Sequence, residues 1–405
     1  MIQRKANLYR LYPTPEQADQ LARFAGACRF VWNLALEQRR DHWRAFRRVH
    51  GRVISYADQA NELPALKVEA PWLKEVPSQA LQQALKDLDR AFANWFAGRA
   101  SYPRPRKRGL ADSFRLPQPR QDDLRRTGRH AGQVRLPKLG WVSLRGWRAL
   151  PGNIRNITIS RRAGHWYAAV QWEREVRDPA PSTLPAVGID RGVVLPFVLS
   201  SGYMVPPLNP GRLLETRSAR LQRSLARKVK FSANWKKEKS RLARLKGREA
   251  AMRRDLLHKL STAIAKSHGL VVMENLKTRN MTASARGTME EPGRNVRAKA
   301  GLNRSILDQG WHLFQTLLGY RLAERGGHLL LVDPACTSQT CSSCGSIDRE
   351  SRKSQAAFAC RACGHEENAD LNAARNILRR GSPLMPVEEA GCSSDEAGTS
   401  LEIAA

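Results

Sequence analysis

The stretch Cys341-Ser-Ser-Cys344, followed after fifteen residues by Cys360-Arg-Ala-Cys363, decides how this chain is interpreted. Two Cys-x-x-Cys pairs at this spacing are typical of one tetrahedral zinc site. A glycine, Gly345 or Gly364, follows each pair, as expected for two tight turns that present thiolates to a metal. Paired disulfides or a chance arrangement are the alternatives. The stretch predicts a small module held by zinc.

An acidic segment lies directly behind the second cysteine pair. It reads Asn368-Ala-Asp370-Leu-Asn372-Ala-Ala-Arg-Asn376 and places Asp370 on the expected first turn of a helix. A carboxylate so close to a metal-held module is a candidate functional group. The alternative is a charge that only interacts favourably with the positive end of the helix dipole.

The charge of the chain indicates a polyanionic partner. Sixty-nine lysines and arginines face thirty-seven acidic residues over 405 residues, which gives a net charge of +32. Contacts to phosphates release condensed counterions, so such an excess favours nucleic acid. An acidic membrane surface is the other candidate, but neither end carries an isolated basic amphipathic anchor. The length allows two or three domains.

The cysteine usage and the apolar runs indicate a compartment. Four of the seven cysteines lie in the pairs, which leaves Cys28, Cys336 and Cys392. This usage suits a reducing environment where thiols bind metal. No apolar run reaches the roughly 18 residues of a membrane span, and no apolar signal segment follows the first residues. We expect a cytoplasmic prokaryotic protein, associated with the nucleoid when on its target, and no membrane partner.

The first half of the chain predicts helices framed by strands. Residues 3–12 alternate weakly as a strand, Thr14-Pro-Glu-Gln17 is typical of a capping box, and 15–97 read as mostly helical with Cys28 in the core. Residues 115–175 predict strands, with a hairpin at 155–172. Between them, 102–108 is a basic loop with two prolines, laid along a phosphate backbone or serving as a solvated linker.

The second half predicts a different domain after a proline-rich boundary at 179–185. Its expected strands are 187–190, 193–199, 270–274 and 328–332. Its expected helices are a basic pair over 212–254, which holds sixteen lysines or arginines and three acids, and a helix over 304–325. We expect 282–297 to be mobile or ordered by a partner and the acidic tail, 381–405, to be disordered.

Three carboxylates occupy comparable places in this second half. Asp190 and Glu274 each end an apolar strand, and Asp370 begins a helix. Hard divalent cations such as Mg²⁺ prefer oxygen ligands, and a metal pair promotes phosphodiester hydrolysis. Taken singly, each has a purely structural alternative. Asp190 could cap a turn, Glu274 could pair with an arginine, and Asp370 could be a helix-end charge. The order of strands and late helix matches a ribonuclease H-like layout, which favours one shared metal site.

The same residues resemble TnpB, the family of transposon-encoded RNA-guided nucleases related to type V CRISPR effectors. The resemblance runs in order over residues 2–380. The segments that carry it are Leu11–Gln17, Arg29–Asn33, Val187–Gly192, Asp255–Ser261, Val272–Leu276, Asn303–Asp308, Thr337–Gly345 and Asn368–Asn376. It implies an RNA-guided DNA endonuclease that cleaves double-stranded DNA beside a short target-adjacent motif. The implied partners are a guide RNA from the transposon end and target DNA.

The resemblance also implies a domain plan of an α+β multidomain protein. A wedge β-barrel would comprise 1–14 and 106–180, and a helical recognition domain 15–105. A RuvC nuclease domain of ribonuclease H-like fold would comprise 181–335 and 366–380, interrupted by a zinc-binding target nucleic acid module at 336–365. The tail would be 381–405.

The site residues follow from the same resemblance. Asp190, Glu274 and Asp370 would hold two Mg²⁺ ions, and Cys341, Cys344, Cys360 and Cys363 one structural Zn²⁺. The candidates for reading the target-adjacent motif are Gln79, Gln82 and Gln83. The candidates for contacting the nucleic acid backbone are the basic helices over 212–254 and the loop residues Arg104, Arg106, Lys107 and Arg108.

Two departures from the family and three rivals remain. Cys336 stands where an aromatic residue is common, and we expect it to be a buried substitute rather than a redox-sensitive or additional ligand. His365-Glu-Glu-Asn-Ala precedes Asp370 in place of an Asp-Arg form. The rivals are a nuclease-silent RNA-guided repressor, a zinc-dependent scaffold or transposition accessory factor, and a CRISPR-associated effector. The sequence leaves open whether the chain forms a homo-oligomer.

Overall fold

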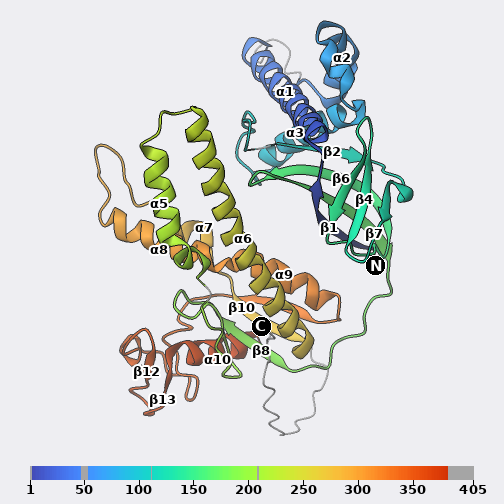
Figure 1. Ribbon diagram of the computed structural model, residues 1–405. Helices are drawn as coiled ribbons and strands as arrows, with labels where there is room; N and C mark the ends of the chain where they lie inside the picture. Colours follow the sequence, from blue (N-terminus) through green and yellow to red (C-terminus); the bar gives the residue numbers. More distant parts are fainter. Residues whose placement is uncertain (1, 47–52, 111, 208, 382–405) are drawn as a thin grey trace. The chain divides into compact units, whose positions relative to one another are not determined.

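The chain forms two compact units, Met1–Arg177 and Asp178–Ala405, each with a hydrophobic core of its own. The computed structural model describes residues 2–46, 53–110, 112–207 and 209–381 (Figure 1). The division falls beside the proline-rich segment. The acidic tail after Gly381 lies outside the described residues. None of the described helices combines the length and apolar character that a membrane crossing needs.

The N-terminal unit is built on an antiparallel sheet in which β1 is central. The strand order is β2-β6-β7-β1-β5-β4-β3. The strands are β1 (Ile2–Tyr12), β2 (Ser113–Pro117), β3 (Leu124–Arg126), β4 (Ala131–Leu136), β5 (Gly140–Arg145), β6 (Asn153–Arg162) and β7 (His165–Glu175). The predicted hairpin is confirmed as β6 and β7, which turn at Ala163 and Gly164, both with positive φ. The order ends at β2 and β3, so the predicted closure into a barrel is not confirmed.

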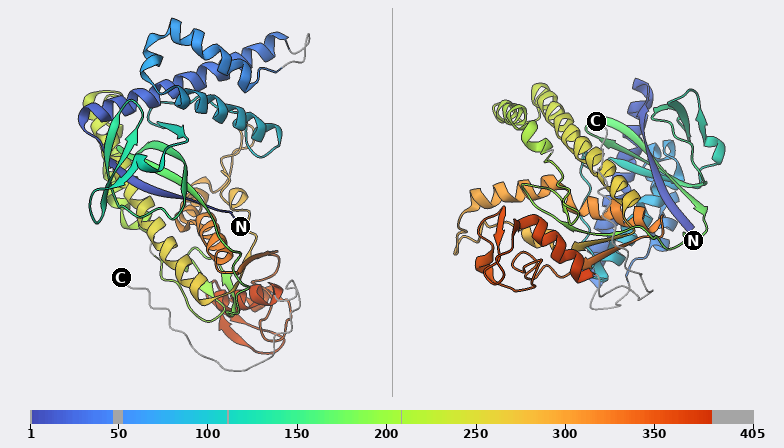
Figure 2. Two further views of the ribbon diagram at one scale, coloured as in Figure 1. Left: turned by 90° about the vertical axis from the view of Figure 1, so that its right-hand side faces the viewer. Right: turned by 90° about the horizontal axis from the view of Figure 1, so that it is seen from below.

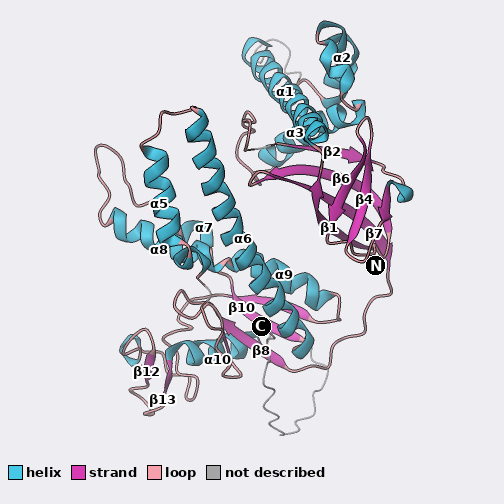
Figure 3. Ribbon diagram, viewed as in Figure 1, coloured by secondary structure: helices cyan, strands magenta, loops and turns pink. Residues whose placement is uncertain are grey.

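Three long helices pack beside this sheet, as Figures 2 and 3 show in several views. They are α1 (Pro15–Phe46), α2 (Tyr56–Glu69) and α3 (Ser78–Phe96), with a 3₁₀ turn at Pro71–Glu75. The predicted capping box is confirmed, because the Gln17 backbone N–H donates to Thr14 Oγ1 at 3.3 Å and the Thr14 N–H donates to Gln17 Oε1 at 3.1 Å. Phe24 of α1 meets Phe114 of β2 edge-to-face at 5.7 Å. Helices and sheet therefore share one core.

The C-terminal unit is built on a smaller, mostly parallel sheet. Its order is β11-β10-β8-β9, with β8, β10 and β11 parallel and β9 antiparallel to β8. The strands are β8 (Ala186–Asp190), β9 (Val198–Leu199), β10 (Leu270–Glu274) and β11 (His328–Val332). Parallel strands put their carboxyl ends at one edge of a sheet, so the last residues of β8 and β10, Asp190 and Glu274, are neighbours there.

Helices cover both faces of this sheet, so β8 and β10 carry buried apolar residues on both faces. Val187, Ile189 and Met273 pack with α6 (Ala233–Ser267) and α9 (Trp311–Ala323) on one face. Val272 packs with Ile377 of α10 (Ala369–Gly381) on the other. Alternate residues of the strands thus pack into the cores on opposite faces of the sheet. Helix α10 lies against the strands that end in the acidic residues (Figure 1).

Close contact between α10 and β8 depends on Gly188. A Cβ there would lie 2.1 Å from the carbonyl oxygen of Ala374 and 2.7 Å from the backbone nitrogen of Leu378, closer than atoms can pack. A side chain at this position would push α10 off the sheet. The approach therefore requires glycine, although Gly188 lies inside a strand.

We expect Gly188→Ala to destabilise the C-terminal unit by about 3 kcal/mol, at the upper end for an overpacked core. The lowered midpoint of thermal unfolding would be followed by circular dichroism. Gly301→Ala is the matched control, because no atom lies within 4 Å of a Cβ there, in helix α8. It should leave the midpoint unchanged or raise it. Equal midpoints for the two variants would contradict the packing argument.

A long helical hairpin projects from this unit and confirms the predicted basic pair. Helix α5 (Glu215–Ala226) runs beside α6, and a short turn over residues 227–232 joins them (Figure 1). Shorter helices are α4 (Pro210–Leu213), α7 (Thr278–Met281) and α8 (Val296–Gln309). The stretch 212–254, which includes α5 and the first part of α6, holds sixteen lysines or arginines and three acids.

Two expectations for this unit were wrong in extent. The strand expected over 193–199 is reduced to β9, and the segment before it forms bends. The helix expected over 304–325 is two helices, because Gly310 adopts φ +69° and ends α8 before α9 begins. The segment 282–297 has bends, an isolated bridge between Gly287 and Pro292, and the start of α8, and its mobility or ordering by a partner stays a prediction.

Candidate functional site

The four paired cysteines converge into one cluster. Their sulfur atoms all lie within 4.8 Å of one another. Cys341 and Cys363 are 3.7 Å apart, as are Cys344 and Cys360, measured between sulfur atoms. A tetrahedral zinc with sulfur at about 2.3 Å requires edges of about 3.8 Å, whereas a disulfide requires about 2.05 Å. The cluster therefore fits a zinc ribbon and not two disulfides.

The two halves of the cluster have the same backbone geometry. In the first, Gly345 donates to the Cys341 carbonyl at 3.0 Å, and in the second, Gly364 donates to the Cys360 carbonyl at 3.0 Å. Both glycines have positive φ, 79° and 75°, which residues with a side chain rarely adopt. The glycines noted in the sequence thus close the turns that aim the sulfurs inward. Strands β12 (Ala357–Ala359) and β13 (Glu366–Asn368) complete the module.

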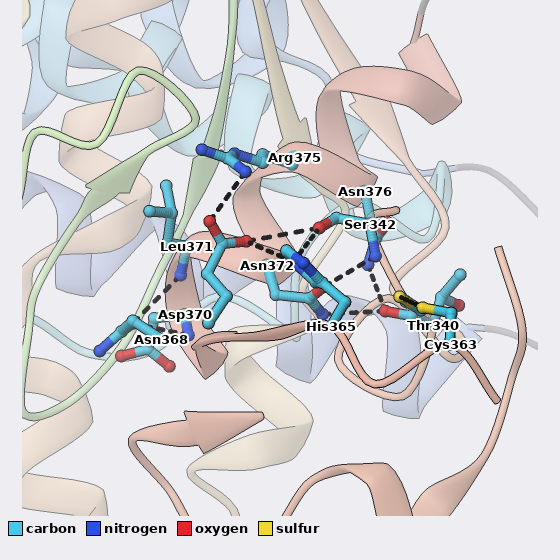
Figure 4. Close-up of polar contacts among 12 residues, drawn as sticks. Thr340, Ser342, Cys363, His365, Asn368, Asp370, Leu371, Asn372, Arg375 and Asn376 are labelled. Atoms are coloured by element: carbon cyan, nitrogen blue, oxygen red, sulfur yellow. Dashed lines mark hydrogen bonds and ion pairs between the residues drawn. The ribbon is translucent and has the colours of Figure 1, made fainter. Parts of the chain in front are cut away.

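Two buried asparagines fasten this module to α10. Asn372 accepts from the Ser342 backbone N–H at 2.8 Å and donates to the Thr340 carbonyl at 2.8 Å. Asn376, one turn further along, donates to the carbonyls of Thr337 and Thr340 at 3.0 and 2.6 Å. Figure 4 shows both amides facing the first cysteine turn. The motif around Asp370 therefore serves also as the seat of the cysteine cluster.

The three predicted carboxylates come together at the carboxyl edge of the small sheet. Asp190 ends β8, Glu274 ends β10, and Asp370 stands in the first turn of α10. The Asn368 side chain caps this turn by accepting from the N–H groups of Asp370 and Leu371 at 3.0 and 3.2 Å (Figure 4). These residues are far apart in sequence. The parallel order of β8 and β10 brings Asp190 and Glu274 together, and the close packing of α10 on β8 adds Asp370.

Burial is the main influence on the pKa values of these three carboxyl groups. Burial first, and then the charges of Glu274 and Asp370, raise the pKa of the Asp190 carboxyl to about 7. Burial also raises the pKa of Glu274, which is 8% exposed, and that of Asp370. The three carboxylates lose solvation by burial, and the charge of Asp190 is repelled by the other two. A bound cation would therefore stabilise this site.

Three residues that the sequence did not single out orient these carboxylates. Thr337 Oγ1 donates to Glu274 Oε1 at 2.6 Å, and the Arg191 guanidinium donates to the Glu274 backbone carbonyl. Arg352, from the cysteine module, lies 3.6 Å from Asp370 Oδ1. Thr337 lies in the resembling segment Thr337–Gly345, yet nothing in the sequence indicated its partner. Arg352 had no signal, because its contact depends on how the module folds back.

The basic loop predicted at 102–108 is irregular, and α1 holds it in place. Asn33 donates to the Arg106 carbonyl at 3.1 Å and accepts from its N–H at 2.7 Å, and the Trp32 indole donates to the Arg104 carbonyl at 3.1 Å. Such anchoring argues against a plain linker. Arg104, Lys107 and Arg108 are exposed, but Arg106 lies half-buried over the Trp32 ring at 3.7 Å. Their binding of nucleic acid stays a prediction.

The glutamines proposed to read the target lie on α3. Gln79 and Gln82 are exposed and Gln83 is half-buried. They are thus placed on the outer side of a helix whose other side, including Leu81 and Leu88, is core. Their role is untested by the structure.

Cys28 and Cys336, which lie outside the cysteine pairs, differ in burial. Cys28 is buried in the N-terminal core, as predicted. Cys336 is exposed, so the expectation of a buried substitute for an aromatic residue was wrong. Its φ of 59° lies in the left-handed region and directs the chain into the turn before Thr337. It is also not a member of the four-cysteine cluster.

Comparisons with known proteins show the family of this chain. The family model "Probable transposase" of the OrfB_IS605 type matches residues 169–285, and "Cas12f1-like, TNB domain" matches 311–377. InsQ of Escherichia coli, named "Putative RNA-guided DNA endonuclease InsQ", is 45% identical over 94% of this chain and 93% of its own length. The chain belongs to the TnpB family. A Streptomyces pristinaespiralis relative, named "Putative RNA-guided DNA endonuclease", is 35% identical over 93% of this chain and 89% of its own.

Two further comparisons bear on the fold of this TnpB-family chain. The "Cryo-EM structure of the Cas12f1-sgRNA-target DNA complex" matches with a TM-score of 0.57 at 15% identity, covering 93% of this chain and 98% of that one. The family model "Helix-turn-helix domain" matches residues 1–48. In the described part of that segment, however, the structure has strand β1 and the single helix α1.

Proposed function

We propose that this protein is an RNA-guided DNA endonuclease whose nuclease site comprises Asp190, Glu274 and Asp370. The convergence of these three carboxylates from separate segments of the chain carries the proposal. A net charge of +32 fits nucleic acid substrates. The names of the relatives, which describe RNA-guided DNA endonucleases, support the same activity.

The donor set fits magnesium. All three side chains offer carboxylate oxygens, the ligands that this hard cation prefers, and their mutual repulsion would be relieved by divalent charge. When bound, a pair of such ions would activate water and stabilise the leaving oxygen of a phosphodiester.

The protein's own groups would hold this site in shape. Thr337 fixes one oxygen of Glu274 and leaves the other free, while Arg191 holds the backbone carbonyl of the same residue. Arg352 would limit the rotation of Asp370. The residues between the cysteine module and the sheet thus position the carboxylates rather than take part in the reaction.

The strand order of the C-terminal unit supports a RuvC assignment. Strand β8 ends in an acidic residue and lies between one parallel partner, β10, and one antiparallel partner, β9, an arrangement expected of a ribonuclease H-like domain. In this proposal the RuvC domain comprises 181–335 and 366–380, and 336–365 is the zinc-binding target nucleic acid module. The wedge domain (1–14 and 106–180) and the recognition domain (15–105) would lie in the N-terminal unit.

A guide RNA would supply sequence specificity. Base pairing with the guide would select the target, and the protein would read a short adjacent motif with residues such as Gln79, Gln82 and Gln83. The α5–α6 hairpin and the loop at 102–108 would contact the nucleic acid backbone. A transposon end is the proposed origin of the guide.

Sequencing the RNA that co-purifies with the protein tests the guide. We expect one defined noncoding RNA with a variable 3′ end, because guide binding requires a fixed scaffold and a changeable target segment. The RNA should then direct magnesium-dependent cleavage of a matching duplex and leave a mismatched duplex intact. Random RNA fragments without directed cleavage would instead indicate a scaffold, and directed binding without cleavage a repressor.

A further inference from the structure

The turn that joins α5 and α6 carries an exposed aromatic pair among lysines, which neither the proposed site nor the cysteine cluster uses. Phe231 is 65% exposed, and its ring lies 5.4 Å from that of half-buried Trp235. Lys230 Nζ lies 5.3 Å from the Phe231 ring centre, and Lys239 Nζ lies 4.8 Å from that of Trp235. We call these four residues the aromatic tip.

The aromatic tip is built into the backbone. The Ser232 N–H donates to the Val229 carbonyl at 3.2 Å and closes a tight turn. The Ser232 hydroxyl then caps α6 by accepting from the Trp235 N–H at 3.1 Å. The turn positions Phe231, and the cap positions the first residues of α6, so both aromatic residues belong to the end of the α5–α6 hairpin. The ribbon shows this turn at the end of the two helices (Figures 1 and 2).

The conformation of Phe231 is unusual for its residue type. Its φ is +70°, in the left-handed region that glycine and asparagine adopt readily and that bulky residues avoid. An exposed phenylalanine at this position neither buries its ring nor suits its backbone. Glycine or asparagine would serve the turn better, which indicates that the ring itself is the useful feature.

We propose that the aromatic tip is a stacking platform for an unpaired nucleobase of a single-stranded nucleic acid. A base has a flat face that stacks on an aromatic ring, and its phosphates fit the surrounding lysines and the basic helices on either side. Double-stranded nucleic acid would meet only the charges, because its bases are already stacked. The inference rests on the nucleic-acid binding part of the proposed function and not on cleavage.

The full-length protein with Phe231→Asn provides the test. Asparagine tolerates the left-handed backbone, so the midpoint of thermal unfolding should stay equal or rise. Loss of one stacked base should raise the dissociation constant for short oligouridylate or oligothymidylate by about tenfold. A base-free strand of equal length and a duplex should bind as before, as measured by fluorescence anisotropy.

Two matched variants separate stacking from other effects. Phe231→Trp keeps an aromatic face and should retain binding. Val229→Asn changes an exposed apolar residue of the same turn. Valine has no aromatic face, so this variant should also bind normally. If Phe231→Asn binds like the unchanged protein, or loses affinity equally for the base-free strand, the platform does not exist. Loss of the folded state in Phe231→Asn would also overturn the proposal, since the ring would then be structural.

Cross-linking identifies which strand supplies the base. In the protein bound to its co-purified RNA and a matching duplex, 5-iodouracil placed in the RNA or in either DNA strand should cross-link to Phe231 or Trp235. Adducts with RNA or with DNA both support the platform and assign its source. Absence of adducts from every strand contradicts it. Because an Asp190 variant tests cleavage separately, failure of the platform would leave the proposed nuclease intact.

Discussion

Replacement of Asp190 by alanine should abolish DNA cleavage and leave RNA binding within a few fold. The carboxylate ends β8 at the centre of the acidic cluster, and its interactions are with Glu274 and Asp370 rather than with a basic surface. Metal-assisted hydrolysis draws several kcal/mol of transition-state stabilisation from correctly held ions, and about 1.4 kcal/mol corresponds to a factor of ten. We expect the cleavage rate to fall by at least about 10³-fold.

The fold should survive this change. Burial and neighbouring charge raise the pKa of Asp190 to about 7, so above that pH its ionised form costs folding free energy, and the cost is lost as the pH falls. Removal of the carboxylate should therefore leave the thermal midpoint without magnesium unchanged or higher, whereas added magnesium should stabilise only the unchanged protein. Asp255→Ala, at an exposed acid of α6, is the matched control and should cleave normally. Retained cleavage by Asp190→Ala with intact magnesium dependence would remove Asp190 from the site.

Replacement of Cys344 by serine should remove most of the zinc and loosen residues 336–365. A tetrahedral structural site needs all four thiolates, and in small zinc modules the metal supplies roughly 10–16 kcal/mol of apparent folding free energy. Elemental analysis should show about one zinc in the unchanged protein and much less in the variant after dialysis. Hydrogen exchange should become faster in the module, because the metal would join its two cysteine turns.

Cys336→Ser is the matched control for this experiment. Cys336 lies five positions before the first zinc-ligand candidate in sequence, is exposed, and stands outside the cluster. Serine there should leave the zinc content unchanged. We also expect Cys344→Ser to slow cleavage, because Thr337 and Arg352 of the same region contact Glu274 and Asp370. An unchanged zinc content in Cys344→Ser would refute the metal assignment.

Local signals in the sequence predicted most of the elements correctly. The capping box at Thr14, the strands that end in Asp190 and Glu274, and the basic helical pair all follow from periodicity and turn residues. Errors arose where one residue interrupts a continuous pattern. Gly310 divides a helix whose apolar spacing continues on both sides, and a Cβ there would lie 2.9 Å from Leu257 Cδ1. That contact depends on α6 and could not be foreseen.

The candidate site likewise has features that local sequence signals predicted and features that they did not. The spacing of the cysteines predicted a cluster because the turns are local, and the structure confirms the cluster. The burial of Cys336 was predicted wrongly, because exposure depends on what packs against a residue. Arg352 and Thr337 were not recognised as partners of the carboxylates, since their contacts arise only when the cysteine module folds back on the sheet.

The sequence alone was enough to predict the types of metal ligand, the tight cysteine turns, the net charge and the family of this protein. These depend on residue chemistry and on neighbours within a few positions. The meeting of Asp190, Glu274 and Asp370 in one site depends on long-range packing. Parallel strands bring the ends of β8 and β10 together, Gly188 lets α10 approach closely, and Asn372 and Asn376 seat the cysteine module on that helix. Such contacts join distant segments, so no local pattern records them.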